Sequence, residues 1–400
     1  MRNSLFPFFC VLMPQIALAM INHGKLVLAP IYTVASGMPP ESVGLIAGLS
    51  GLGSVWFFAA SGGILPRFGP IKALIFACVL APTAAIMFAL EQSWLVLPSA
   101  LFIGFAYAIT APAGSQILAT HTPKKLWGTL FSLRMAGVPV GGAVAGVLGA
   151  FLAARYDWRI ALLAIITPAL LTGLFLIFAS KKITSPISKD SFKILNLFKP
   201  SNFISPFKVL LRIPGLPLIT FVSVGFAAIQ GGVFTFLTTY LTKELGFSLT
   251  LAGGLYATMQ GASFIGRVFA GLIADRFFSA RTVLVTLGLM SATGVSCLTL
   301  INGNFSPALL FPAVGLIGVS IASWNGLFMA EVSNIAENYD VSEATSASTF
   351  FTFISYMLAP PCFGLIAISY GYTYAFLSVG FCGLLAVGAL LLQTIKERRI

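Results

Sequence analysis

The feature that most constrains this chain is a series of twelve apolar runs, separated by short polar or Pro/Gly-containing breaks. Each run is about 20 residues long, the length that an α-helix needs to cross the hydrocarbon core of a bilayer. Only 8% of the 400 residues are charged, whereas ordinary soluble domains carry about a quarter. The runs also lack the alternating pattern of membrane β-barrel strands. We therefore predict an all-α polytopic membrane protein with twelve transmembrane helices.

The runs fall into two halves that resemble each other. "GGILPRFG" at 62–69 aligns with "GLIADRFF" at 271–278, and at the same spacing Gly44 aligns with Gly253. Parallel repeats of this kind are one standard architecture of transporters. We predict two pseudo-symmetric six-helix bundles, residues 1–180 and 214–400, joined by a basic linker at 181–213. The predicted helices are 6–35, 42–65, 71–90, 94–116, 127–154 and 159–180, then 214–241, 249–274, 281–301, 306–330, 344–369 and 373–395.

The positive charges predict the orientation in the membrane. The net charge is +12, and the linker is rich in lysine, with Asp190 as its one acidic residue. Basic loops stay on the cytoplasmic side, and the other basic loops alternate in phase with this one. Both termini are therefore expected in the cytoplasm, with the chain in a plasma membrane, as in a bacterial inner membrane. The linker could also contact anionic lipid, whereas nucleic acid is not an expected partner.

Enzymatic and metal sites find little support in the sequence. The five cysteines are scattered without paired spacing, and we interpret them as small buried apolar residues. His23 and His121 are far apart, and neither a Gly-x-Ser-x-Gly nor a phosphate-binding Gly-x-x-x-x-Gly-Lys motif is present. We predict no enzyme activity, no cofactor and no metal.

The loop motifs resemble those of the major facilitator superfamily of transporters. The family's Gly-x-x-x-Asp-Arg-x-Gly signature is matched in part twice, with Pro66 replacing the acid in the first copy and Phe278 the second glycine in the other. "AGVPVGG" at 136–142 is similar to the fifth-helix element of family exporters and some importers. The resemblance implies two six-helix bundles, transport by alternating access and a monomer.

Three segments refine this resemblance. "SLRMAGVPVGG" and "TAPAGSQIL" look like bacterial organic-anion and cyanate-type carriers, and "GRVFAGLIADR" resembles the eighth helix of monocarboxylate carriers. Those carriers place an acid one turn before the arginine, where this chain has Ser263. Their proton-linked pairing is therefore not carried over.

Three full charges lie well inside the predicted helices, and all are basic: Lys25, Arg134 and Arg267. A charge at the bilayer centre costs at least ~2.5 kcal/mol, so such residues usually face a cavity. By the resemblance, the fifth and eighth helices face each other, which would place the two arginines at matched depth. An anionic substrate between them would relieve their repulsion. The alternative is that these side chains reach out to the headgroups.

Further polar residues complete the predicted site. His23 is a candidate for proton coupling, although it lies about 200° from Lys25 around the helix unless Gly24 breaks it. Glu331 closes the tenth predicted helix and is expected to meet water. The predicted substrate-binding residues are Lys25, Arg134, Arg267, Tyr107, Gln230, Trp324 and Asn325.

We predict a secondary active or facilitative transporter that moves a small organic anion, such as a monocarboxylate. The alternatives are a drug or metabolite exporter of the same superfamily and, more remotely, a membrane sensor that does not transport. Exporters of cationic drugs usually carry acids in their cavity, whereas the charges here are basic.

The loop motifs supply the predicted gating residues. By the resemblance, Asp275 meets the start of the fifth helix and stabilises the outward-open state by about 0.5–2 kcal/mol through the helix dipole. The full predicted set is Gly62, Arg67, Gly69, Gly271, Asp275, Arg276, Gly137, Pro139, Gly141 and Gly142.

Replacing Asp275 with Asn is expected to shift the population toward the inward-open state, because the amide no longer complements the positive helix end. Labelling of an engineered cysteine from the periplasmic side measures this shift. Unchanged periplasmic accessibility would remove the hypothesis.

Overall fold

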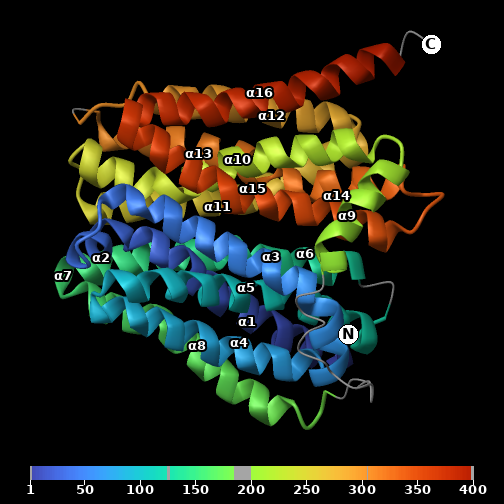
Figure 1. Ribbon diagram of the computed structural model, residues 1–400, viewed down its shortest axis with the longest axis horizontal. Helices are drawn as coiled ribbons and strands as arrows, with labels where there is room; N and C mark the ends of the chain where they lie inside the picture. The colour runs from blue at the N-terminus through green and yellow to red at the C-terminus, as the bar shows by residue number, and fades with distance from the viewer. Residues whose placement is uncertain (1, 124–126, 184–199, 304, 398–400) are drawn as a thin grey trace. The chain divides into compact units, whose positions relative to one another are not determined.

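The computed structural model describes residues 2–123, 127–183, 200–303 and 305–397, and this part of the chain is helical with no strand (Figure 1). It divides into two compact units. The first contains residues 1–40 and 49–202, and the second contains 41–48 and 203–400. The first residues of the helix at 43–68 thus belong to the second unit, and the rest of that helix belongs to the first.

The first unit is built on α1, which contacts α5, α6 and α8, while α4 packs against α5 and α8. A five-residue π-helical segment at Ala145–Gly149 connects α6 to α7. The helices are α1 (Arg2–Val27), α2 (Ala29–Ala35), α3 (Val43–Phe68), α4 (Pro70–Ile86), α5 (Ser93–His121), α6 (Trp127–Val144), α7 (Ala150–Arg155) and α8 (Trp158–Ala179), with short 3₁₀ turns at Pro40–Ser42 and Met87–Leu90.

The second unit is built on α10, which contacts α14, α15 and α16, while α11 packs along α13. Its apolar core is centred on Phe226, Trp324 and Phe328. The helices are α9 (Pro200–Arg212), α10 (Leu216–Thr239), α11 (Leu249–Arg276), α12 (Ala280–Leu298), α13 (Pro307–Ala322), α14 (Trp324–Ile335), α15 (Val341–Tyr370) and α16 (Tyr372–Glu397), with a π-helical segment at Tyr240–Glu244.

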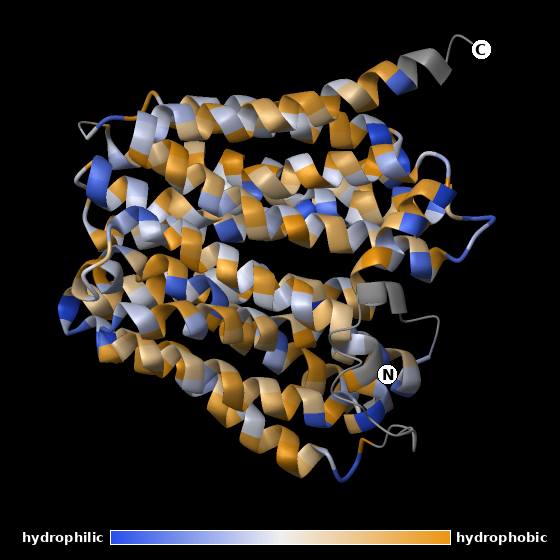
Figure 2. Cartoon of the chain, viewed as in Figure 1, coloured by the Kyte–Doolittle hydropathy of each residue, from blue (hydrophilic) through white to orange (hydrophobic). Residues whose placement is uncertain are grey.

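Each predicted apolar run is helical, although two of them are broken. The run at 6–35 divides at Leu28, ahead of Pro30, and the run at 306–330 divides at Ser323. Eleven segments of the described chain are long and apolar enough to cross a membrane. The predicted helix at 249–274 forms as α11 but is not among them; it carries Gln260, Ser263 and Arg267. Figure 2 shows hydrophilic residues within otherwise apolar helices of both units.

Glycines in α6 bring it against α1. A Cβ at Gly137 would lie 3.1 Å from Ile16 Cγ1, and a Cβ at Gly141 would lie 2.5 Å from the Ile16 carbonyl oxygen and 2.9 Å from the Met20 nitrogen. The two glycines are one turn apart, so both lie on the same face of α6. This spacing of small residues is typical of close helix contacts in membranes.

The two copies of the loop motif end differently. Gly69 has φ of 79° and precedes Pro70 at the start of α4, a conformation that glycine adopts without strain. In the second copy α12 is instead capped by Ser279, whose side chain accepts a hydrogen bond from the Thr282 nitrogen. Phe278 can therefore replace the second glycine, because that copy does not need a positive φ.

The interpretation of the cysteines holds in part. Cys10 and Cys78 are buried, but Cys297, Cys362 and Cys382 are exposed on the surface of the second unit. An apolar run does not distinguish a core-facing position from a lipid-facing one, so burial of these three was wrongly expected.

Gly141→Ala is expected to lower the free energy of unfolding by about 1–3 kcal/mol, because its Cβ overpacks the backbone of α1. Gly388→Ala in α16 is the matched control, since nothing lies within 4 Å of a Cβ there. Melting of the purified protein in detergent measures both. Equal melting temperatures would show that α1 and α6 can separate at no cost.

Candidate functional site

Lys25 lies near the end of α1 with 4% of its surface exposed. Its Nζ donates to Asn22 Oδ1 at 2.7 Å and to Ser50 Oγ on α3. Both acceptors are neutral, and within the described ranges no carboxylate forms an ion pair with this lysine. A buried ammonium group is thus held by hydrogen bonds without a compensating negative charge.

A close helix crossing brings Ser50 to Lys25. Gly53 and Gly104 lie where α3 and α5 meet, and a Cβ on either would collide with the other helix's backbone. Ser54 Oγ donates to the Gly104 carbonyl at 2.9 Å across the same crossing. The contact therefore depends on small residues from two helices as well as on the lysine.

His23 is buried in the same helix, with 5% of its surface exposed. α1 continues through Gly24 to Val27, because Leu28 still donates to the Gly24 carbonyl at 2.9 Å. The helix is unbroken at the position where a break would have been needed. His23 and Lys25 consequently lie on different sides of α1.

Arg134 on α6 is also buried, with 4% of its surface exposed. Its Nη1 donates to the carbonyls of Thr110 at 3.1 Å and Ala111 at 2.9 Å, both on α5. Gly114 makes room for it, since a Cβ there would lie 2.9 Å from Nη1. The guanidinium group is therefore bound to the backbone of a neighbouring helix and does not extend to solvent. Tyr107 lies one turn before Thr110 on α5 and is partly buried.

Arg267 on α11 binds at the break in the tenth predicted helix. Its Nε donates to the Ala322 carbonyl at 2.9 Å. Ala322 ends α13, and the last carbonyls of a helix lack an intrahelical donor. Asn325 Nδ2 lies 3.5 Å from the same oxygen. A Cβ at Gly266 would collide with Ser323, so this glycine allows α11 to approach the break.

Gln230, Trp324 and Tyr356 form one hydrogen-bonded cluster in the second unit. Gln230 Oε1 accepts from Trp324 Nε1 at 3.1 Å and from the Tyr356 hydroxyl at 2.7 Å. Trp324 is fully buried and stacks on Phe226 with a centroid separation of 5.3 Å. The predicted residues Gln230 and Trp324 are therefore in contact, and Tyr356, absent from the predicted set, joins them from α15.

The ion pair between Glu331 and Arg281 was not predicted from the sequence. Glu331 on α14 is 7% exposed and forms an ion pair with Arg281 at the start of α12. The expectation that Glu331 meets water was wrong, because its position near the helix end does not reveal the neighbouring arginine. The sequence does place an arginine and a glutamate at the ends of two predicted helices, which is a weak indication that they could pair.

The loop-motif residues lie at helix ends. Arg67 is exposed near the end of α3, and Asp275 and Arg276 are exposed at the end of α11.

The small residues of the predicted gating set differ in their surroundings. Gly271 has nothing within 4 Å of a Cβ, unlike Gly137 and Gly141. Gly142 is buried, Pro139 lies inside α6, and the surroundings of Gly62 lie outside the description. The predicted contact between Asp275 and the fifth helix stays a prediction.

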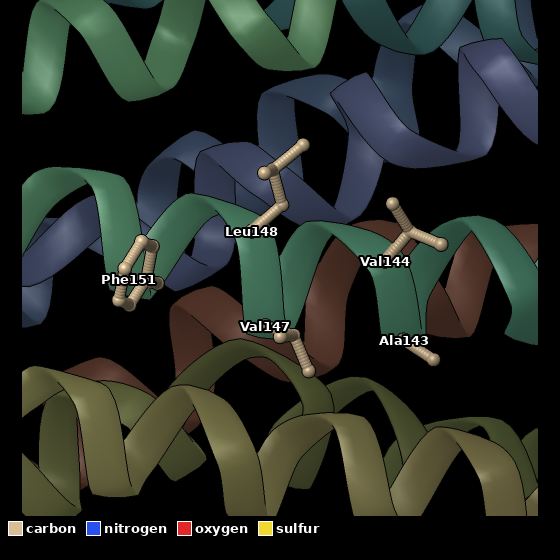
Figure 3. Close-up of a pocket in the computed structure, with 5 residues that line it drawn as sticks. All are labelled: Ala143, Val144, Val147, Leu148 and Phe151. Atoms are coloured by element: carbon tan, nitrogen blue, oxygen red, sulfur yellow. The ribbon is translucent and has the colours of Figure 1, made fainter.

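An apolar hollow lies along the segment that runs from α6 through the π-helical residues into α7 (Figure 3). Its lining is Ala143, Val144, Val147, Leu148 and Phe151. None of these side chains has a polar group. The hollow therefore offers no chemistry that would recognise a charged solute.

Comparison with known proteins agrees with this architecture. A 380-residue alignment at 23% identity relates the chain to an uncharacterised MFS-type transporter of Mycobacterium tuberculosis, covering 94% of this chain and 81% of that protein. An agnestins efflux protein of Paecilomyces divaricatus is 25% identical over 347 residues, covering 84% of this chain and 74% of the other.

Solved structures share the fold at low identity. A D-xylose–proton symporter superposes with a TM-score of 0.75 at 15% identity, covering 97% of this chain and 96% of the other. A bacterial homologue of the human lysosomal transporter Spinster, inward-facing and occupied, gives 0.74 at 13% identity, covering 98% and 97%. The family model of the Major Facilitator Superfamily matches residues 11–352, so this multi-pass membrane protein belongs to that superfamily of transporters.

Proposed function

We propose that this protein is a secondary transporter that moves a small organic anion across the membrane by alternating access. The observation that carries the proposal is Lys25, a buried cation whose hydrogen-bond acceptors, Asn22 and Ser50, are both neutral. A buried charge without a counter-charge is costly. A substrate carboxylate would supply the missing negative charge.

The two arginines take different parts in this proposal. Arg134 is bound to two carbonyls of α5, so it holds α5 and α6 together and adds positive potential. Arg267 donates through Nε to a carbonyl at a helix break. A break that leaves carbonyls without intrahelical donors is a natural place for a conformational change, and Arg267 is the group that stabilises it here. Gln230 and Asn325 supply neutral polar groups in the same unit.

The orientation in the membrane and the mode of transport form part of the same proposal. Both termini are assigned to the cytoplasmic side of a plasma membrane, because the linker is basic. No proton-coupling step is assigned to His23. Exchange, coupled transport and facilitated diffusion are all compatible with a site whose charges are basic.

Efflux of a metabolite is a second candidate function. The likeness to the agnestins efflux protein, at 25% identity, favours it. An exported metabolite that carries a carboxylate would use the same lysine. An exported cation would instead need an acid in the site, and Lys25 would repel it.

Small carboxylates are expected to raise the melting temperature of the purified protein, and Lys25→Gln is expected to abolish the rise. Arg134→Gln and Arg267→Gln are expected to weaken the rise. The first variant removes positive potential, and the second removes the group that stabilises the helix break. The panel compares carboxylates, inorganic anions, amines and lipophilic cations, with Arg155→Gln as an exposed control. Stabilisation by cations, or equal stabilisation by anions in every variant, would contradict the anion carrier and favour the exporter.

Lys25→Met is expected to leave the free energy of unfolding unchanged or to raise it by up to about 2 kcal/mol, because it removes a buried charge. Ser50 Oγ lies 3.4 Å from Asn22 Oδ1, so these two groups can still pair. Thermal melting without ligand measures the effect. A large loss of stability would assign the lysine a packing role in place of a binding role.

A further inference from the structure

α9 is attached to the second unit along one of its faces. Val209 is 4% exposed and Ile213, just after the helix, is fully buried; both belong to the apolar core of that unit. A second line of contact is aromatic, with Phe207 at 4.8 Å and Phe203 at 6.5 Å, centroid to centroid, from Phe351 and Phe350 of α15. The helix is thus a fixed part of the fold.

The opposite face of α9 is an exposed stripe of mixed character, formed by Ile204, Lys208 and Leu211. Ile204 is 50% exposed and Leu211 is 80% exposed, and Lys208 is exposed between them. The spacing of four and then three residues places all three side chains on one side of a helix. Large apolar side chains on this face would be unfavourable in water.

The charges at this stripe are basic. Within the described chain, no carboxylate forms an ion pair with Lys208, whereas Arg212 pairs with Glu343 at the start of α15. Lys208 therefore keeps its positive charge available to an anion at the surface. An apolar stripe beside an available cation is the composition of helices that lie in a membrane interface.

The chain itself keeps α9 close to the membrane boundary. α9 ends at Arg212 and the membrane-spanning segment begins at Leu216. Four Cα steps separate Arg212 from Leu216, and a fully extended chain of that length reaches at most about 14 Å. Gly215, with φ of 83°, makes the turn between them. The C-terminal end of α9, which carries Lys208 and Leu211, is consequently held close to the start of the membrane-spanning segment.

We propose that the Ile204–Lys208–Leu211 stripe of α9 is a lipid-binding surface that inserts its apolar side chains between acyl chains and binds the phosphate of an anionic phospholipid through Lys208. The apolar part explains the exposure of Ile204 and Leu211, and the cation selects an anionic over a zwitterionic headgroup. A cytoplasmic placement, which rests on the proposed topology, would put the stripe on the leaflet that carries anionic lipid.

Titration of the purified full-length protein with short-chain phosphatidylglycerol tests this surface, with the melting temperature as the readout. Lys208→Gln is expected to raise the half-saturating concentration about fivefold, the effect of one basic residue near a membrane surface. Leu211→Ser is expected to weaken phosphatidylglycerol and phosphatidylcholine alike, because it removes the apolar contact. Lys243→Gln is the matched control, since Lys243 is exposed at the other end of the same membrane-spanning segment.

Further titrations distinguish a phospholipid headgroup from free phosphate as the anion that binds. Inorganic phosphate alone is expected to give no shift, because the apolar contact is missing. A shift with inorganic phosphate equal to that with phosphatidylglycerol would overturn the lipid assignment in favour of a free-anion site. Equal curves for wild type, Lys208→Gln and Lys243→Gln would overturn the assignment of the surface to α9. Neither result would bear on the anion carrier, whose test uses Lys25.

Discussion

The rest of the structure depends on one constraint: inside a bilayer, every backbone N–H and C=O must find its partner within the protein. Continuous helices meet this requirement, and it explains why the described chain consists of helices joined by short turns, without a strand. The two interrupted runs are therefore informative. At Ser323 the break leaves the end of α13 with carbonyls that lack helical donors, and Arg267 donates to one of them at 2.9 Å. The partly buried Arg267 thus donates to a backbone oxygen that the break leaves without a helical donor.

The same low-dielectric interior determines how the other charges are held. Arg134 donates to two carbonyls of α5, and Lys25 donates to an amide oxygen and a hydroxyl. These neutral oxygen atoms accept hydrogen bonds from the two cations but leave the positive charge uncompensated. Glu331 shows the contrasting solution, because near a helix end it forms an ion pair with Arg281. The buried cations thus differ from an ordinary salt bridge, and the proposed anionic substrate rests on this difference.

Close packing by glycine makes these contacts possible. Gly104 allows α3 to bring Ser50 to Lys25, Gly114 makes room for the guanidinium of Arg134, and Gly266 admits the approach of α11 to the break at Ser323. Lipid offers little hydrophobic drive for helices to associate. Van der Waals contact between closely packed small residues therefore has to favour association. The glycines are therefore as much a part of the candidate site as the cations whose positions they allow.

The sequence by itself determined the number and approximate bounds of the apolar helices, the repeat of its two halves and the identity of the charges inside them, because hydropathy and charge are local properties of the chain. It also identified Gln230 and Trp324 as polar residues in apolar runs. Only the tertiary structure decided that they share a hydrogen-bonded cluster with Tyr356, that Arg134 binds the backbone of α5, and that Glu331 is paired and buried. Each of these depends on which helix lies alongside and on which face it presents. Hydropathy does not distinguish a core-facing position from a lipid-facing one in a membrane protein, and this is why the exposure of three cysteines was decided by the fold.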